Sequence, residues 1–131
     1  MASNGQPSVA IVDDDPSLCR ALGRLFSAAG INSIAYSSAE AFLEDQNSPE
    51  PGCLILDIQL GGMSGLDLQK SLSAQAREIP VIFITAHDEP EYAEQAERSG
   101  CLAYLRKTDP GQLVLENVQR ATRLQRTEKN R

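Results

Sequence analysis

Apolar and polar positions follow two different spacings along the chain. Short, almost wholly apolar runs predict buried strands, because strands covered on both faces of a parallel sheet are apolar throughout. Between these runs, apolar residues recur every three or four positions, which is typical of amphipathic helices. The predicted strands are residues 8–12, 31–36, 53–56, 81–84 and 102–105.

Start and stop signals bound the predicted helices. The first helix runs from Pro16 to Ala29, and Gly30 ends it in the manner of a C-terminal cap. Ser37 and Glu40 have the spacing of a capping box and open the second helix. The later helices are marked by Leu66, Leu68 and Leu72, by Asp88 and Pro90, and by Asp109 as a cap with Pro110 in the first position.

The order strand–helix occurs five times. Such alternation predicts an α/β fold in three layers, with a parallel sheet between helices. With right-handed crossovers, five strands can form a doubly wound, flavodoxin-like sheet in the order 2-1-3-4-5, and this is the order we expect. Ligands bind such sheets at the carboxyl ends of the strands, beside the switch point between strands 1 and 3.

Length and charge narrow the class of protein. The 131 residues are enough for one domain, and we expect a disordered segment 1–7, a domain 8–124 and a charged tail 125–131. The net charge of −6 argues against direct binding of nucleic acid, which needs a basic face. Basic residues between 120 and 131 are typical of a solvated helix end.

Cysteine usage and hydropathy indicate the compartment. The three cysteines are widely spaced and form no Cys-x-x-Cys pair, so neither a zinc site nor a redox pair is expected. The N-terminus has no basic stretch followed by an apolar run, as a secretory signal would. No apolar stretch approaches the roughly 20 residues that span a membrane. We therefore expect a cytoplasmic protein without membrane contact.

Polar residues stand where four of the predicted strands end. The first strand ends at Asp13, Asp14 and Asp15, the third at Asp57, the fourth at Thr85 and the fifth just before Lys107. The predicted sheet brings these positions to one edge. Clustered carboxylates suit Mg²⁺, which prefers oxygen ligands, and an aspartate can act as a nucleophile toward phosphorus. A lysine and a hydroxyl group would then bind the phosphoryl oxygens.

Each of these residues has an ordinary alternative explanation. The three consecutive aspartates fit a turn whose last member caps the first helix. Singly, Asp57 fits a loop, Thr85 a cap and Lys107 a solvated charge. The functional interpretation is favoured because all four strand ends supply what one reaction needs.

Four segments resemble the receiver domains of bacterial two-component response regulators, and the resemblance covers about residues 8–124. They are Ala10–Pro16, Leu54–Gly65, Pro80–Ala86 and Gly100–Lys107. The resemblance implies a phosphorylation-dependent signalling switch rather than an enzyme acting on external substrates. Its own chemistry would be self-catalysed phosphotransfer and autodephosphorylation.

The resemblance also implies a role for each matched residue. Asp57 would be the phosphoacceptor, and Lys107 would bind the phosphate. Asp13, Asp14, Asp57 and the backbone carbonyl of Gln59 would hold Mg²⁺, with Asp14 favoured over Asp13 as the direct ligand. Thr85 and Tyr104 would be the switch hydroxyl and the switch aromatic residue.

The partners follow from the same family. A histidine kinase or a histidine phosphotransfer protein would supply the phosphoryl group. The face made by the fourth helix, fifth strand and fifth helix would control an output protein or a fused output domain, transcriptional in related receivers, or form a homodimer. Whether the natural protein is a stand-alone receiver or part of a longer regulator stays open.

The sequence departs from the family at two positions that usually hold proline. Gly61 stands four residues after the acceptor, which favours a more flexible loop. Thr108 follows the lysine, and a trans peptide bond is expected there, since a cis bond without proline costs about 2.5–4 kcal/mol. Neither change removes a group that the chemistry needs.

Three rival functions are weaker. A binding module without phosphorylation would not need the full set of acidic residues and the lysine. A phosphatase with an aspartate nucleophile would carry a second Asp where Gln59 stands. A nucleotide-binding flavodoxin-like protein would carry a loop rich in Gly, Ser or Thr after the first strand.

Two residues flank the expected phosphoryl group. Gln59 lies two residues after the acceptor, and its amide would orient the water that hydrolyses the phosphate. His87 lies two residues after Thr85 and would either shield the site or accept a proton from that water. For His87 an exposed loop position is nearly as good an interpretation.

Overall fold

Five parallel strands form one sheet in the order β2-β1-β3-β4-β5, as the sequence predicts. The computed structural model describes residues 8–86 and 89–129, and the surroundings of side chains as far as residue 123. The strands are β1 (Ser8–Val12), β2 (Asn32–Tyr36), β3 (Cys53–Asp57), β4 (Val81–Thr85) and β5 (Ala103–Arg106). The helices are α1 (Pro16–Ala28), α2 (Ala39–Glu44), α3 (Gly65–Ala74), α4 (Pro90–Arg98) and α5 (Gly111–Lys129).

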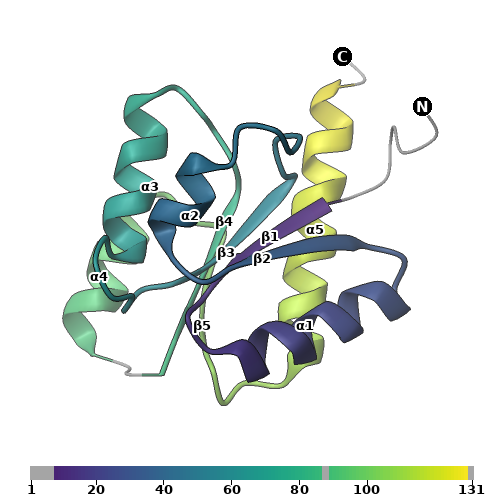
Figure 1. Ribbon diagram of the computed structural model, residues 1–131, viewed down its shortest axis with the longest axis horizontal. Helices are drawn as coiled ribbons and strands as arrows, with labels where there is room; N and C mark the ends of the chain where they lie inside the picture. The colour runs from purple at the N-terminus through teal and green to yellow at the C-terminus, as the bar shows by residue number, and fades with distance from the viewer. Residues whose placement is uncertain (1–7, 87–88, 130–131) are drawn as a thin grey trace.

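Helices cover both faces of this sheet (Figure 1). One apolar cluster joins the sheet to α1 and α5 through residues such as Phe26 and Val118. A second cluster joins the opposite face to α2, α3 and α4 through Phe42, Leu68 and Ala96. The three-layer α/β fold expected from the alternating pattern is therefore confirmed.

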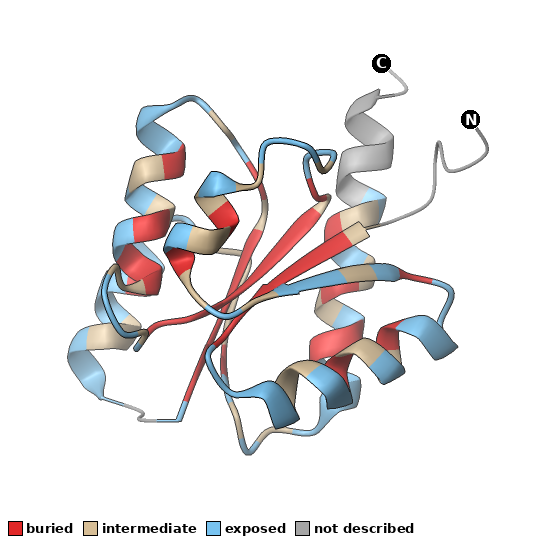
Figure 2. Cartoon of the chain, in the orientation of Figure 1, coloured by how far each residue is buried: buried red, intermediate tan, exposed pale blue. Residues whose placement is uncertain are grey.

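The central strands are buried along their whole length (Figure 2). All five residues of β3 and of β4 are buried, which explains why their sequences are almost wholly apolar. At the edge, β2 is half exposed, and this explains its weaker apolar pattern. Among the described residues no helix is long and apolar enough to cross a membrane.

The topology places two acidic residues beside each other. β1 lies between β2 and β3, and Val12 of β1 pairs with Leu56 of β3. One residue beyond this pair, Asp13 follows β1 and Asp57 ends β3. Two carboxylates 44 positions apart in sequence thus meet at the switch point of the sheet.

The N-terminal caps differ in part from those expected. Ser38, not Ser37, caps α2, because the Ser38 side chain accepts a hydrogen bond from the backbone N–H of Ala41 at 3.0 Å. Asp15 caps α1 by accepting from the backbone N–H groups of Ser17 and Leu18. The capping role expected for Asp109 is wrong: its carboxylate accepts from the backbone N–H of Arg106 at 2.9 Å.

Candidate functional site

Asp57 lies at the carboxyl end of the most buried part of the sheet. Only 4% of the residue is exposed. The backbone N–H of Gln59 donates a hydrogen bond to Asp57 Oδ1 at 3.0 Å, and Lys107 Nζ donates to Oδ2 at 2.9 Å. The carboxylate is thus fixed by one contact on each oxygen, at the carboxyl end of the sheet.

Lys107 joins Asp57 to Asp13. Its backbone N–H donates to the carbonyl oxygen of Thr85 at 2.8 Å, which continues the β4–β5 pairing past the end of β5. From there Nζ also donates to Asp13 Oδ1 at 3.2 Å. Asp13 Oδ1 accepts in addition from the backbone N–H of Asp15 at 2.9 Å, so the turn after β1 is held by the same oxygen.

The other oxygen of Asp13 is buried without a hydrogen bond. Asp13 Oδ2 lies 3.0 Å from Lys107 Nζ and forms an ion pair with it, although the geometry does not make this contact a hydrogen bond. The ammonium compensates part of the cost of burying this oxygen, and a second cation near the carboxylates would compensate more. The exposed Asp14 completes the group: one oxygen each of Asp13, Asp14 and Asp57 lie within 4.8 Å of one another. Such a donor set can hold a hard divalent cation.

Burial and hydrogen bonding act on the pKa of Asp57 in opposite directions. Burial raises the pKa of Asp57 most strongly, and the neighbouring Asp13 raises it further, while hydrogen bonds from Lys107 and Gln59 lower it. The net result is a pKa above the ordinary value. For Lys107, burial lowers the pKa, but the hydrogen bonds to Asp57 and Asp13 outweigh burial and raise it. A cation near these carboxylates would relieve the repulsion between them.

Thr85 and Tyr104 lie on neighbouring strands at this end of the molecule. Thr85 is the last residue of β4 and is 1% exposed. Tyr104 pairs with Phe83 across β4 and β5, and its ring packs against the cluster under α2, α3 and α4. The roles expected for both residues in switching stay predictions.

Of the two residues expected to flank the phosphoryl group, the structure describes Gln59 but not His87. The Gln59 side chain reaches toward α4, where its Nε2 donates to the hydroxyl oxygen of Tyr92 at 2.8 Å. It therefore has a partner on α4, which the sequence did not indicate. His87 lies outside the described residues.

Comparison with known proteins decides the family. The family described as Response regulator receiver domain matches residues 9–118. This chain belongs to that family. The match includes the turn after β1, Asp57, Thr85 and Lys107.

Relatives of this receiver domain include both longer regulators and single domains. It is 38% identical over 122 residues to the response regulator protein TmoT of Ectopseudomonas mendocina, covering 92% of this chain and 56% of that protein. It is 33% identical to the C4-dicarboxylate transport transcriptional regulatory protein DctD of Pseudomonas aeruginosa, covering 94% of this chain and 27% of that protein. The chain thus spans about half the length, or less, of these curated relatives.

A solved structure agrees with the fold. The crystal structure of a response regulator receiver protein from Burkholderia phymatum is 39% identical, with a TM-score of 0.78. The similarity covers 89% of this chain and 95% of that one. At this identity the arrangement of strands and helices is shared over nearly the whole receiver domain.

Two residues of this receiver domain support the site in roles that the sequence did not indicate. Gly65 begins α3 directly behind Asp57, and a Cβ atom there would collide with the Asp57 carbonyl oxygen. Glu40 of α2 accepts a hydrogen bond from the backbone N–H of Met63 at 2.9 Å, and so anchors the loop after β3. A glycine directly after Ser64, at the start of an apolar helix, was the available signal for the role of Gly65. No local pattern indicates the contact between Glu40 and Met63.

The two departures from the family pattern leave the site intact. Among the described residues no peptide bond is cis, so Lys107–Thr108 is trans as expected. The Asp109 carboxylate accepts a hydrogen bond from the backbone N–H of Arg106 and so closes the turn that contains Thr108. Gly61 lies in the loop that Glu40 anchors two residues later, at Met63.

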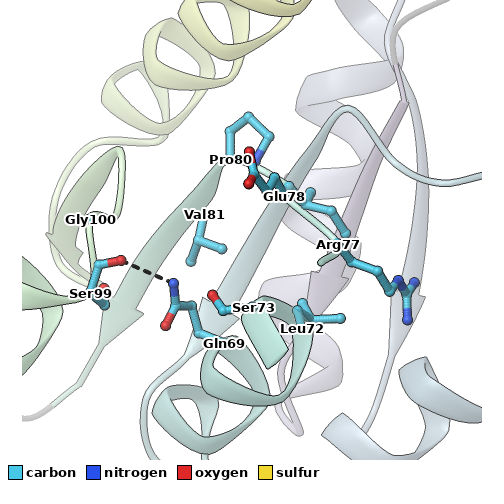
Figure 3. A pocket seen from close by; sticks show the side chains of 10 residues that line it. Gln69, Leu72, Ser73, Arg77, Glu78, Pro80, Val81, Ser99 and Gly100 are labelled. Carbon is cyan, nitrogen blue, oxygen red and sulfur yellow. Dashed lines mark hydrogen bonds between the residues drawn. The ribbon is translucent and has the colours of Figure 1, made fainter. Parts of the chain in front are cut away.

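A cavity at the other end of the sheet lies away from this chemistry. It has a volume of about 420 Å³ and opens at the amino ends of β4 and β5, where Val81 and Gly100 line it (Figure 3). There Gln69 Nε2 donates to the carbonyl oxygen of Ser99 at 3.1 Å. Asp57 and Lys107 lie at the opposite ends of the strands, so this cavity does not belong to the acidic site.

Proposed function

We propose that this receiver domain is a phosphorylation-dependent switch of a two-component system, with Asp57 as the phosphoacceptor. The observation that carries the proposal is the triad of Asp57, Asp13 and Lys107, in which one ammonium bridges two buried carboxylates at 2.9 and 3.2 Å. This arrangement combines a nucleophile, a metal-binding acid and a fixed positive charge. It suits phosphoryl transfer, in which positioning and electrostatics supply most of the catalysis.

The transfer forms one bond and breaks another. A carboxylate oxygen of Asp57 attacks the phosphorus of a donor, and the bond from phosphorus to the donor breaks with its electron pair leaving on the donor atom. In a phosphohistidine that atom is the ring nitrogen; in acetyl phosphate it is the acetate oxygen. Lys107 Nζ, now on Asp57 Oδ2, would then bind an oxygen of the transferred group, and the Thr85 hydroxyl would donate to another.

Mg²⁺ fits the acidic residues that surround this position. Asp13 Oδ2 is buried and lacks a hydrogen bond, and Asp14 and Asp57 offer further oxygens nearby. We propose that these three residues and the backbone carbonyl of Gln59 hold the ion. When bound, Mg²⁺ neutralises charge on the phosphoryl oxygens.

The output would be a change of shape on one side of the domain. A phosphoryl group that draws Thr85 inward would leave space that Tyr104 enters, since both belong to the adjacent strands β4 and β5. The face formed by α4, β5 and α5 would then favour an output partner, a fused output domain or a second copy. The bias comes from contacts that exist only in the phosphorylated form.

The partners follow from the family and from the length of its members. A histidine kinase or a histidine phosphotransfer protein in the bacterial cytoplasm is the proposed donor. The relative DctD is named as a transcriptional regulatory protein, which supports a transcriptional output. We propose that residues 8–124 form the receiver itself and that 125–131 are a charged tail.

Labelling tests the proposal directly. With Mg²⁺ and acetyl phosphate, the protein is expected to gain one base-labile acyl phosphate, visible as one added phosphoryl mass. Asp57→Ala should abolish the gain, whereas Asp67→Asn, which neutralises an exposed aspartate in the first turn of α3, should leave it unchanged. Labelling of Asp57→Ala at the wild-type rate would show that the acceptor is another residue.

Thr85→Ala separates phosphorylation from switching. The variant keeps Asp57, Lys107 and the acidic group, so it should still accept phosphate. It should lose most of the phosphorylation-dependent change in hydrogen exchange on α4 and β5. An undiminished change in Thr85→Ala would contradict the proposed switch.

A further inference from the structure

The loop that follows Asp57 is tied to α4 by one side-chain contact. Gln59 Nε2 donates to the Tyr92 hydroxyl oxygen at 2.8 Å, across 33 positions of sequence. The backbone N–H of the same residue donates to Asp57 Oδ1 at 3.0 Å. Gln59 therefore links the phosphoacceptor carboxylate, through its backbone, to the first turn of α4, through its amide.

The surroundings allow this contact to open. Gln59 is exposed, and beside it lies a cavity of about 440 Å³ between the loop, α3 and α4, lined by Ile58, Leu66 and Tyr92 among others. Of the residues of α4 only Ala96 is fully buried, and Glu89 provides no side-chain cap for the helix. α4 is thus lightly packed, and the Tyr92 hydroxyl joins its first turn to the loop by a hydrogen bond that is exposed to solvent.

We infer that Tyr92 is a positioning residue for Gln59 and thereby sets the lifetime of the phosphoryl group on Asp57. This inference rests on the proposed function. While the Tyr92 hydroxyl holds the Gln59 amide, the side chain is directed to α4 and is withheld from the water that attacks phosphorus. A partner that moves the first turn of α4 releases the amide and shortens the lifetime.

The step being controlled is hydrolysis. The oxygen of a water molecule bonds to phosphorus, and the bond from phosphorus to the Asp57 carboxylate breaks with its electron pair returning to the carboxylate. Both hydrogens of the water leave with the inorganic phosphate as H2PO4⁻, which then exchanges protons with the solvent. A released Gln59 accelerates this step by orienting the attacking water with its amide oxygen or nitrogen.

A double-mutant cycle tests the inference on the full chain. The protein is labelled with acetyl phosphate and Mg²⁺, the donor is removed, and loss of phosphate is followed over time. Tyr92→Phe keeps the packed ring and should speed the loss by about threefold or more, a change that is readily measured. In a Gln59→Ala background, Tyr92→Phe should have no further effect, because the coupling needs both partners. Tyr36→Phe, which removes a 2.6 Å hydroxyl contact to Asp45 on the far edge strand, should leave the decay rate unchanged.

The outcomes separate this inference from the proposed function. Normal labelling with an unchanged decay rate in Tyr92→Phe would overturn the role of Tyr92 alone. An acceleration that persists in the Gln59→Ala background would show that Tyr92 acts through general loosening of α4, which also overturns it. If the wild-type protein takes up no phosphate on Asp57, both the proposed function and this inference fail.

Discussion

At the residue scale, the site depends on close approach between the end of β3 and the start of α3. Gly65 is buried, and its backbone N–H donates to the carbonyl oxygen of Ile58 at 3.1 Å. The triad of Asp57, Asp13 and Lys107 could be anticipated from the sequence, because each residue directly follows or ends a strand. The contacts of Glu40 with Met63 and of Gln59 with Tyr92 could not, because they join loops and helix faces that no short-range pattern relates.

The close approach predicts a cost for any side chain at position 65. Gly65→Ala should lower the free energy of unfolding by about 1–3 kcal/mol, since its Cβ would collide with the Asp57 carbonyl oxygen. Urea unfolding measures this change. Gly61→Ala is the matched control, because a Cβ there meets open space, and it should be neutral or stabilising by up to about 1 kcal/mol. Equal stabilities for the two variants would contradict the packing described at Gly65.

At the element scale, strands were easier to anticipate than helix starts. The buried strands β3 and β4 carry unbroken apolar runs, which leave little doubt about their position. The predicted N-cap of α2 was wrong by one residue. Ser37 and Ser38 both suit an N-cap, and only the backbone geometry selects Ser38. Asp109 is likewise a residue type that often caps helices, but its carboxylate accepts a hydrogen bond from the backbone N–H of Arg106 instead.

A contact between the end of β2 and the residue after α2 predicts a pH dependence of the free energy of unfolding. Asp45 accepts from the Tyr36 hydroxyl at 2.6 Å, and this contact, with those from Ser48 and Asn47, lowers the pKa of Asp45 from 3.8 to about 2. A lowered pKa in the folded state stabilises the protein above pH 3.8 and loses that contribution as the pH falls toward about 2. The stability gap between wild type and Asp45→Asn should therefore narrow over this range in chemical denaturation.

Tyr36→Phe provides the control for this pH effect. It removes the largest cause of the lowered pKa while it keeps the Asp45 carboxylate. Its stability should depend less on pH than that of the wild type between pH 4 and about 2. A gap between wild type and Asp45→Asn that stays constant with pH would exclude the contribution assigned to this hydrogen bond.

At the scale of the whole molecule, strand order turns scattered residues into a site. The order β2-β1-β3-β4-β5 brings the ends of β1 and β3 together and sets β5 with Lys107 close enough to reach both. The repeated strand–helix pattern and the handedness of crossovers allow this order, and it is the one that the sequence analysis expects. The amino ends of the same strands line a separate cavity and carry none of the acidic triad.

Repulsion within this site predicts that Mg²⁺ stabilises the fold. The ion should bind the native state in preference to the unfolded chain, so millimolar Mg²⁺ should raise the melting temperature. Asp14→Asn should reduce the shift, because Asp14 contributes one of the clustered oxygens. Glu78→Gln, an exposed change just before β4 at the opposite edge, should retain the full shift. The same shift in wild type and Asp14→Asn would argue against this site.

Asp57, among three clustered aspartates, is the residue that we propose receives the phosphoryl group. Borohydride reduction of the phosphorylated protein converts the acceptor aspartate to homoserine, and peptide mass spectrometry then locates the converted residue. We expect homoserine at Asp57 alone, dependent on both Mg²⁺ and the phosphodonor. Conversion at Asp13, Asp14 or an exposed aspartate, with Asp57 unchanged, would contradict this proposal.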